Sequence, residues 1–449
     1  MIKINVMLKR KIETYIEEFL APRPQKILIL DGARQTGKTF IIRQVGKKLF
    51  KNYVEINLLD DSLNERNFAD AMSVSAFYLQ LSALAGSKLS SKEDTLVFLD
   101  EIQAYPHLLT LLKFLNQDNR YTYIASGSEL GITLFKTLSI PMGSIEIKHL
   151  YPLDFEEFLW ANGVGDEFIS HCREMFLARK SLQESFHKRM MELFRKYLLV
   201  GGLPEAVQSF VDDTNIATVR RIQSQIHEYY GVDASRYDQE NRLKIRRIYD
   251  MIPSVLENKK KRIVARDIEG KDSKRFKDYQ DEFDYLIASG IALDVKAIST
   301  PVFPLVESMS KNLLKLYLND VGVLTGILYR NNINPILNDE RSVNLGTVYE
   351  SVVAQELKAH GFQLFYYDNK KNGEVDFLID DYEHLSVLPL EVKSGKDYYV
   401  HSALDHFLKN DDYSVKRGIV FCNEGVVEEK GGVTYMPVYN VMFLNPEGV

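Results

Sequence analysis

The chain has 449 residues, of which 45% are hydrophobic and 26% charged, and its formal net charge at pH 7 is -6. A chain of this length exceeds what one hydrophobic core holds, so roughly three domains are expected. The composition is that of an ordinary globular protein and excludes disorder as a global description. The negative net charge gives no whole-chain attraction to nucleic acid, although a local basic face is compatible with it.

Neither the first twenty residues nor the two cysteines point to export. The first twenty residues mix charges at helical spacing, which does not fit a secretory signal. No stretch approaches the ~18 apolar residues that span a bilayer. Cys172 and Cys422 lie far apart and outside any CxxC motif, so neither a disulfide nor a zinc site is expected. We therefore expect a cytoplasmic protein without membrane contact.

Short aliphatic runs alternate with helical patterns over residues 1–160. Such alternation predicts a parallel sheet covered by helices on both faces, which is a doubly wound α/β domain. The runs are KILILDG, YVEINLL, TLVFLDE, YTYIASGS and SIEIKHL.

The remaining chain divides into three predicted parts. Residues 161–249 carry apolar residues three and four apart, which predicts a helical lid or connector. Residues 250–312 have a helix, helix and hairpin order compatible with a winged-helix module. Residues 313–449 return to a mixed α/β pattern, with a helix in GTVYESVVAQELKAHG followed by strand-like runs.

A phosphate-binding loop is predicted directly after the first aliphatic run. The motif G-x-x-x-x-G-K-[ST] is matched without a mismatch, and its glycines allow backbone N–H groups to face phosphate. Lys38 would reach the β- and γ-phosphates and Thr39 would ligate Mg²⁺. A chance glycine loop is the alternative, and Arg34 and Gln35 are expected to be variable loop positions. The predicted nucleotide contacts are Gly32, Ala33, Arg34, Gln35, Thr36, Gly37, Lys38, Thr39 and Phe40.

Two later strand ends supply polar side chains that complete such a site. TLVFLDE ends in Asp100, expected to hold Mg²⁺, and Glu101, expected to orient the attacking water. The next strand ends in Ser126 and Ser128, which are candidates to sense the γ-phosphate. A solvated acidic loop and a polar turn are the respective alternatives.

With these motifs placed, the chain resembles prokaryotic AAA-type ATPases in which a P-loop domain precedes a C-terminal domain of unknown function. The resemblance implies ATP binding through Lys38, Thr39, Asp100 and Glu101. Many relatives have Gly-Arg where this chain has Gly143 and Ser144, so hydrolysis follows from the resemblance less firmly than binding. The matching stretches are GARQTGKT, LVFLDEIQ, IASGSEL, LYPLDFEEFLW, YLLVGGLPEAV, KLYLNDVGVL and GTVYESVVAQEL.

A second acidic constellation lies in the C-terminal part. Glu350 is in a predicted helix, Asp376 in one strand-like run, and Glu391 and Lys393 two apart on the next run, so that their side chains share a face. Carboxylates around Mg²⁺ with a lysine beside them suit phosphodiester hydrolysis, with Asp376 and Glu391 as metal ligands. The set resembles the PD-(D/E)xK nuclease superfamily and its restriction-endonuclease-like fold. An inactive nuclease-derived fold and a solvated charged face remain as alternatives.

Basic residues gather between the two constellations. They occupy 259–262 and, further on, Lys271, Lys274, Arg275 and Lys277. In a winged helix, the second group would begin a recognition helix that contacts nucleic-acid phosphates. A solvated lysine-rich surface is the interpretation we favour.

These motifs together predict a Mg²⁺-dependent AAA-type ATPase that couples nucleotide state to a C-terminal nuclease-like domain acting on DNA. A nucleotide-dependent scaffold with little hydrolysis is one alternative, and a metal-dependent nuclease regulated by ATP is another. ATP and Mg²⁺ are the expected ligands, while DNA, a protein partner and self-association stay open as partners.

Overall fold

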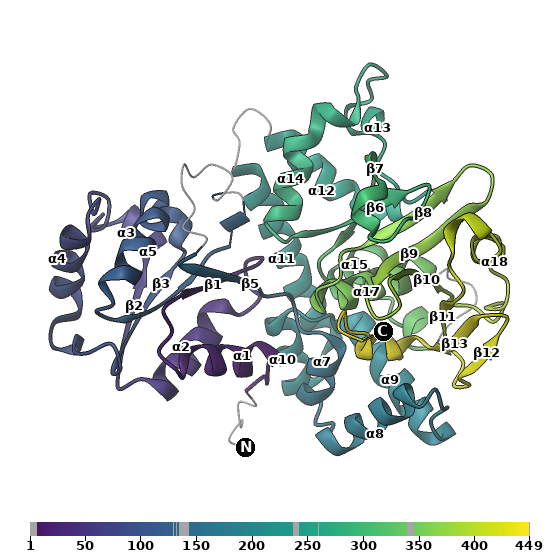
Figure 1. Cartoon of the computed structure of the whole chain (residues 1–449), viewed down its shortest axis with the longest axis horizontal. Coiled ribbons are helices and arrows are strands. Elements are labelled where there is room, and N and C mark those ends of the chain that lie inside the picture. Colours follow the sequence, from purple (N-terminus) through teal and green to yellow (C-terminus); the bar gives the residue numbers. More distant parts are fainter. Residues whose placement is uncertain are drawn as a thin grey trace. The chain divides into compact units, whose positions relative to one another are not determined.

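The computed structural model describes residues 7–128, 130–131, 133, 143–236, 242–258, 260–338 and 345–448 (Figure 1). The chain forms two compact units. The first consists of Lys9–Tyr151 with Ala288–Gly290, and the second of Met1–Leu8, Pro152–Ile287 and Ile291–Val449.

The first unit contains a five-stranded sheet whose strands are all parallel, in the order β2-β3-β4-β1-β5. Each aliphatic run of the sequence forms one of its strands. The prediction of a parallel α/β domain in this part of the chain is therefore confirmed. The strands are β1 (Ile27–Asp31), β2 (Asn52–Asn57), β3 (Thr95–Asp100), β4 (Thr122–Ser126) and β5 (Ile145–His149).

Alternate residues of each central strand enter two separate cores, because side chains along a strand point to opposite faces. Leu28 and Leu30 pack with α1 (Lys11–Leu20) and α2 (Lys38–Leu49). Ile27 and Ile29 pack on the other face with α4 (Val74–Ala85) and α5 (Pro106–Asp118), and the short α3 (Leu58–Leu63) follows β2. Helices on both faces bury both sides of the strands, which explains their unbroken apolar runs. Figure 1 shows this layered arrangement.

Strand order decides where the polar strand ends meet. β4 lies between β1 and β3, so its carboxyl end separates the end of the glycine loop strand from the end of the Asp100 strand. Parallel strands end at one edge of the sheet, and ligands in such sheets bind in the crevice outside those ends.

The second unit begins with helices, as predicted for residues 161–249. They pack through buried apolar faces such as Phe194, Tyr197 and Leu198 on α9. The helices are α7 (Phe155–Ala161), α8 (Asp166–Leu177), α9 (Glu184–Val200), α10 (Pro204–Asp213), α11 (Ile216–Arg236) and α12 (Arg242–Leu256).

The predicted helix, helix and hairpin of residues 250–312 are present, but the hairpin does not stand alone. It consists of β6 (Ala292–Ile298) and β7 (Met309–Leu318), after α13 (Ala265–Glu269) and α14 (Gln280–Ala288). β6 also pairs in parallel with β8 and so extends the C-terminal sheet. The proposed boundary between 312 and 313 falls inside β7, because hydrogen bonds across a sheet do not follow a boundary drawn from local pattern. The division into domains therefore stays a prediction.

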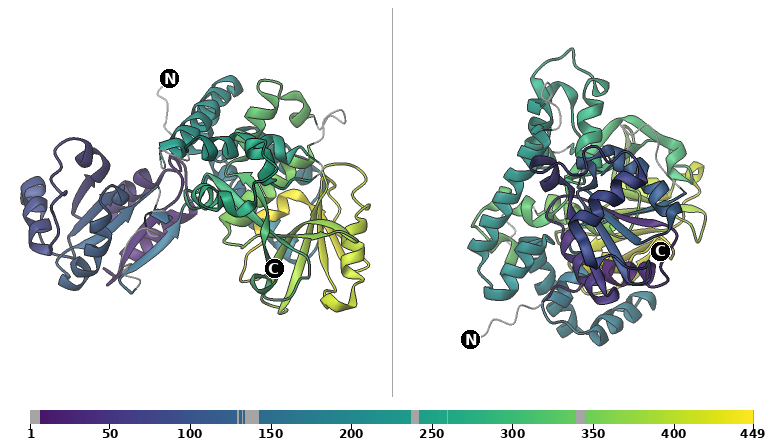
Figure 2. Two further views of the ribbon diagram at one scale, coloured as in Figure 1. Left: turned by 90° about the horizontal axis from the view of Figure 1, so that it is seen from above. Right: turned by 90° about the vertical axis from the view of Figure 1, so that its left-hand side faces the viewer.

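The C-terminal sheet has eight strands in the order β12-β13-β11-β10-β9-β8-β6-β7, with both parallel and antiparallel pairs. Figure 2 shows it as one continuous layer from green to yellow. A mixed α/β architecture is thus confirmed, whereas a restriction-endonuclease-like fold stays a prediction. The remaining strands are β8 (Phe365–Asn369), β9 (Gly373–Asp381), β10 (Ser386–Val392), β11 (Gly418–Cys422), β12 (Glu428–Lys430) and β13 (Val433–Pro437).

Helices cover this sheet as well. α17 (Gly346–Ala359) is buried along most of its length, and α18 (Ser402–Leu408) packs Leu404 and Phe407 into an aromatic core on the sheet. The short α15 (Val321–Tyr329) and α16 (Asn334–Leu337) precede α17.

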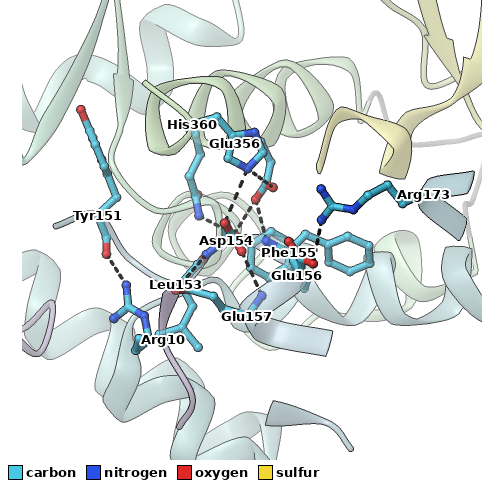
Figure 3. Close-up of polar contacts among 12 residues, drawn as sticks. Arg10, Tyr151, Leu153, Asp154, Phe155, Glu156, Glu157, Arg173, Glu356 and His360 are labelled. Atoms are coloured by element: carbon cyan, nitrogen blue, oxygen red, sulfur yellow. Dashed lines mark hydrogen bonds and ion pairs between the residues drawn. The ribbon is translucent and has the colours of Figure 1, made fainter. Parts of the chain in front are cut away.

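A buried polar cluster joins the start of α7 to α17 (Figure 3). Glu356 is fully buried, and its Oε1 accepts from the Phe155 backbone N–H at 2.9 Å and the Tyr197 hydroxyl at 3.0 Å. Asp154 caps α7 through the Glu157 N–H, and the His360 ring lies 3.5 Å from its carboxylate. The acidic residues of the LYPLDFEEFLW stretch therefore make structural contacts inside the second unit.

Both cysteines are free thiols, and burial raises the pKa of each to about 11. In the described part of the chain, no helix has the length and apolarity needed to cross a bilayer.

Candidate functional site

The glycine loop after β1 has a backbone that only glycine accommodates at two points. Gly32 has φ +139°, and a Cβ there would lie 2.3 Å from the Leu150 carbonyl oxygen. Gly37 has φ +97° and occupies the position before the first residue of α2. The loop therefore wraps closely around the N-terminus of α2, which presents unpaired backbone N–H groups and a partial positive charge to an anion.

Two side chains behind the loop hold it in place. The Thr36 hydroxyl donates to the Ala33 carbonyl at 2.9 Å. The buried guanidinium of Arg10 donates to the Thr36 carbonyl at 3.1 Å and to the Tyr151 carbonyl at 2.8 Å, the latter drawn in Figure 3. Arg10 was not predicted, since a charged residue just before a surface helix carries no signal for a contact this far along the chain.

The Lys38 side chain reaches back into the phosphate loop that precedes it. It is 5% exposed, and its Nζ donates to the Gly32 and Ala33 carbonyls at 2.8 Å each. Burial lowers the Lys38 pKa, while the nearby carboxylates of Glu101, Asp31 and Asp100 oppose that shift. The ammonium is therefore held in position at a cost in solvation that a bound phosphate would offset.

Thr39, Asp100 and Ser126 converge from α2, β3 and β4. The Thr39 hydroxyl lies 3.1 and 3.0 Å from the two Asp100 carboxylate oxygens, and Ser126 donates to Asp100 Oδ1. Burial raises the Asp100 pKa, and Glu101 adds to the shift, while both hydroxyls oppose it. A hydroxyl and a carboxylate at one point are oxygen ligands of the kind Mg²⁺ takes, so the pair fits that ion.

Glu101 sits next to this pair in a left-handed conformation, φ +57°, at the start of the turn after β3. The Ser128 hydroxyl donates to Glu101 Oε2 at 2.9 Å, and the Gln103 amide also donates to Oε2. Gln103 further reaches Ser128 Oγ at 3.2 Å. Among the residues that the structure describes, none donates to Glu101 Oε1, so that oxygen is the one available to a water molecule.

The two predicted sensor serines thus donate hydrogen bonds to different carboxylates. Ser126 donates to Asp100, and Ser128 donates to Glu101. Gln103 was not predicted, although its place two residues after Glu101 in LVFLDEIQ was a usable signal. A second unpredicted pair lies at the ends of β1 and β5, where His149 Nδ1 is 3.2 Å from Asp31 Oδ2.

The outer residues of the predicted nucleotide contacts differ in exposure. Arg34 is half-buried and its charge contributes to lowering the Lys38 pKa. Gln35 is exposed, and Phe40 is 52% exposed in the first turn of α2. Lys148, a cation near Ser144 in sequence, lies 4.9 Å over the ring of Tyr15. Nucleotide contact by Arg34, Gln35 and Phe40 stays a prediction.

The residues of the C-terminal constellation lie around β9, β10 and α17. The Val392 backbone N–H donates to Asp376 Oδ2 at 2.8 Å across the strand pair, and Lys393 Nζ donates to Glu391 Oε1 at 2.8 Å. Burial raises the pKa of Asp376 well above its usual range, and the Glu350 and Glu391 charges add to it. Burial also raises the Glu391 pKa, against the pull of Lys393. The quartet therefore shares one low-dielectric site.

Further cations that were not predicted enter this site. Lys261 pairs with Glu350 Oε1, and the Tyr317 hydroxyl reaches Glu350 Oε2 at 3.3 Å. The fully buried Lys315 has its Nζ 2.5 Å from Glu374 Oε1. Within the described residues no group of three or more His, Cys, Asp or Glu side chains lies so as to hold a metal ion. The metal predicted at Asp376 and Glu391 gains no support from this geometry and stays a prediction.

The two basic segments go to different places, and Lys259 lies outside the described residues. Lys261 faces Glu350, and Arg262 pairs with Asp368 at 2.8 Å. Lys261 and Arg262 are therefore paired rather than solvated. In the second segment Lys271, Arg275 and Lys277 are exposed, as on the solvated lysine-rich surface that we favoured from the sequence. Both segments nevertheless contribute to one cavity of about 550 Å³. It is lined by Arg262 of the first segment, by Arg266, and by Lys274, Arg275 and Lys277 of the second segment.

Comparison with known proteins supports the assignment of the first unit. Residues 24–159 match a family model described as an AAA domain. The N-terminal part of this chain is therefore similar to AAA-type P-loop domains, in line with its loop and strand order. Two other models match residues 191–333 and 345–441, and each is described as a domain of unknown function, DUF8612 and DUF4143.

Individual relatives are distant. Uncharacterized protein MJ1544 of Methanocaldococcus jannaschii is 25% identical over 365 residues, covering 79% of this chain and 72% of that protein. The solved structure of the Walker-type ATPase PABY2304 of Pyrococcus abyssi aligns with a TM-score of 0.44 at 14% identity, covering 73% of this chain and 97% of that one. The Thermotoga maritima RuvB Holliday junction branch migration motor aligns with a TM-score of 0.30 at 13% identity, covering 65% and 91%.

Proposed function

We propose that the protein binds and hydrolyses MgATP at the carboxyl edge of the five-stranded sheet. The observation that carries this proposal is the convergence of three contributions at that edge. These are the phosphate loop with its buried Lys38, the Thr39 hydroxyl against Asp100, and the Glu101 carboxylate held by Ser128 and Gln103.

The chain's own residues divide the work. The backbone N–H groups at the start of α2 and the Lys38 ammonium bind the phosphates and balance their charge. Thr39 and Asp100 would hold Mg²⁺, which supplies charge neutralisation at the phosphates when it is bound. Ser126 fixes the Asp100 carboxylate, and so sets the direction of its second oxygen.

Glu101 is the residue that separates an ATPase from a passive switch. Both of its donors use Oε2, which fixes the carboxylate and leaves Oε1 to accept a hydrogen bond from a water. From there Glu101 accepts a hydrogen bond from the attacking water and takes its proton as the water adds to the γ-phosphorus and the bond to the β-phosphate oxygen breaks.

The test is a comparison of turnover and ATP affinity in wild type and Glu101→Gln, with Glu18→Gln on the exposed face of α1 as a matched control. We expect Glu101→Gln to lower kcat by about 10²–10⁴-fold at unchanged ATP affinity, the usual range for loss of a general base. Tight ATP binding with no turnover in the wild type would favour the nucleotide-dependent scaffold instead. Equal turnover in wild type and Glu101→Gln would reject the role of Glu101.

A second candidate function belongs to the C-terminal site. We propose that the Glu350, Asp376, Glu391 and Lys393 set acts on phosphodiesters of DNA under control of the nucleotide state, or derives from a site that did. The buried shared charge of the quartet supports it, and the pairing of Lys261 with Glu350 identifies a cation that would have to leave Glu350 before a metal could bind there.

Incubation of the full chain with DNA and Mg²⁺ or Mn²⁺ tests this candidate. An active nuclease loses cleavage in Asp376→Ala and Glu391→Ala and keeps it in Lys38→Ala if ATP is only regulatory. Lys261→Met should raise Mn²⁺ affinity, measurable by calorimetry independently of cleavage. No cleavage, or equal cleavage by wild type and Asp376→Ala, would exclude catalysis.

Contact with DNA phosphates is assigned to the basic cavity around Lys274 and Arg275. Charge reversal of both residues should weaken DNA binding and flatten its dependence on salt, because fewer counterions would be released. Unchanged binding in that variant would remove this surface from the proposal.

A further inference from the structure

A cavity of about 500 Å³ lies in the second unit between α11 and α15. Its volume is within the ~300–1,000 Å³ range of ligand pockets. Three arginines and a histidine line it, and none of the lining residues that the structure describes is acidic. In a chain whose formal net charge is -6, such a lining is a local concentration of positive charge. The charged and polar lining residues are Arg220, Arg221, Gln223, Ser224, His227, Arg330 and Asn331.

Arg220 is the buried member of this set, at 6% exposure. Its Nη1 donates to the Leu199 carbonyl at 3.1 Å, the Gly322 carbonyl at 3.1 Å, the Thr325 hydroxyl at 3.0 Å and Gln223 Oε1 at 2.8 Å. These contacts tie α11 to α15 and to the end of α9, but they use only one of the three guanidinium nitrogens.

The other two nitrogens, Nε and Nη2, are buried and have no hydrogen-bond partner among the described residues. Their N–H groups lie along one edge of the guanidinium, which is the fork that receives two oxygens of a carboxylate or phosphate. A buried donor left unpaired is unfavourable, so this edge has an unmet demand for an acceptor.

No carboxylate meets that demand from within the described part of the chain. The acidic group that acts on Arg220 through space is Asp320, whose own oxygens accept from the Gly202 N–H at 2.6 Å and the Val323 N–H at 3.0 Å. Burial lowers the Arg220 pKa to about 10, with Asp320 opposing, so the side chain still carries its charge at neutral pH.

Two more arginines at the rim of the cavity add positive charge. Arg221 and Arg330 are exposed, and Arg330 takes a left-handed conformation at the end of α15. A buried guanidinium with two unpaired donor nitrogens lines the same cavity as two exposed arginines, and such a set of arginines recognises an oxyanion.

We propose that this cavity binds the phosphate group of a small phosphorylated molecule, at a site separate from the phosphate loop of the first unit. Arg220 holds two oxygens of the phosphate through Nε and Nη2, and Arg221 and Arg330 neutralise the remaining charge. The site would give the DUF8612 region a ligand of its own, since residues 217–331 of the cavity lie within the matched range 191–333.

The experiment uses the full chain carrying Lys38→Ala, so that the phosphate loop does not contribute. Titration calorimetry with inorganic pyrophosphate should show saturable binding in this background. Added Arg221→Glu or Arg330→Glu should each raise Kd by about tenfold or more, and both positions are exposed, so folding should be retained. Arg189→Glu, exposed on α9 and outside the cavity, gives the same change in charge as a control. Arg220→Lys keeps the buried charge and removes the fork, and is expected to weaken binding further.

Absence of saturable binding in the Lys38→Ala background would overturn the proposal. So would equal effects of Arg221→Glu, Arg330→Glu and the Arg189→Glu control, because the charge would then act without a site. A short oligothymidylate supplies a separate arm. Binding of that strand with the same arginine dependence, without pyrophosphate binding, would assign the cavity to nucleic-acid phosphates and reject a small-molecule ligand.

Discussion

Replacing Lys38 with methionine should stabilise the nucleotide-free protein and abolish its stabilisation by MgATP. Lys38 is 5% exposed, and its ammonium donates to the Gly32 and Ala33 carbonyls of the loop at 2.8 Å each. Two hydrogen bonds from a charged donor return about 1.5–3 kcal/mol each. Removing an ammonium from water costs several kcal/mol even after relaxation.

The lowered Lys38 pKa decides which effect is larger, because burial outweighs the neighbouring carboxylates. Each unit by which a pKa falls corresponds to about 1.4 kcal/mol against the charged form. Methionine keeps most of the apolar stem, so we expect the free energy of unfolding of the nucleotide-free protein to rise by on the order of 1 kcal/mol.

The sign of the pH dependence follows from the same shift. With a folded-state pKa below the unfolded value, the unfolded chain holds more protons between the two values. The penalty is therefore complete below the folded-state pKa and disappears as the pH rises toward 10.5, the ordinary lysine value. The stability advantage of Lys38→Met should shrink between pH 7 and pH 10.

Thermal unfolding with and without MgATP measures both parts. At a ligand concentration of ~100 Kd, binding stabilises the wild type by about 2.7 kcal/mol. This corresponds to a rise of roughly 5–11 °C in the responding transition. Lys38→Met should lose that rise, whereas Lys47→Met, exposed on the same helix, should keep it. The reasoning fails if nucleotide-free Lys38→Met is less stable than wild type by more than about 1 kcal/mol, or if MgATP still stabilises it.

Three further substitutions test the phosphate loop and two buried carboxyl groups of the second unit. Gly32→Ala places a Cβ 2.3 Å from the Leu150 carbonyl oxygen at φ +139°, so it should abolish ATP binding and cost about 1–3 kcal/mol of stability, measured by calorimetry and urea unfolding. Burial raises the Asp320 pKa to about 6, so the free energy of unfolding should fall as pH rises from about 4 to 7. Asp320→Asn should lack about 2 kcal/mol of that fall in urea titrations at both pH values. Glu356→Ala leaves the Phe155 N–H without its acceptor and removes one of the two acceptors of the Tyr197 hydroxyl, which keeps the Leu153 carbonyl, and should cost about 2–5 kcal/mol in urea unfolding.

Each of these has a matched control. Gly86→Ala also has positive φ but meets open space, so it separates conformational strain from the clash expected at Gly32. Asp212→Asn and Glu192→Ala alter exposed carboxyl groups on α10 and α9 and should change stability by less than about 0.5 kcal/mol. ATP binding by Gly32→Ala would contradict the first argument. A wild-type pH profile that matches that of Asp320→Asn would contradict the second. A Glu356→Ala variant as stable as Glu192→Ala would contradict the third.

The sequence by itself determined the elements whose signals are local. Residues 32–39 are contiguous, so the loop, its glycines and Lys38 follow from spacing alone, and unbroken apolar runs identified the strands. Asp100 and Ser126 were found without knowing the strand order, because parallel strands place their carboxyl ends at one edge. Their hydrogen bond confirms that expectation.

The tertiary structure decided the contacts between residues far apart in the chain. Arg10 bonds the Tyr151 carbonyl, and Lys261 pairs with Glu350. No local sequence pattern around either residue predicts its partner. Pairing of β6 with β8 likewise joined a hairpin predicted as a separate module to the C-terminal sheet. Local periodicity records which face of an element is buried, whereas the counter-ion of a buried charge is set by which elements pack together. The unmet donors of Arg220 could therefore be recognised only after α11, α15 and α9 were in place.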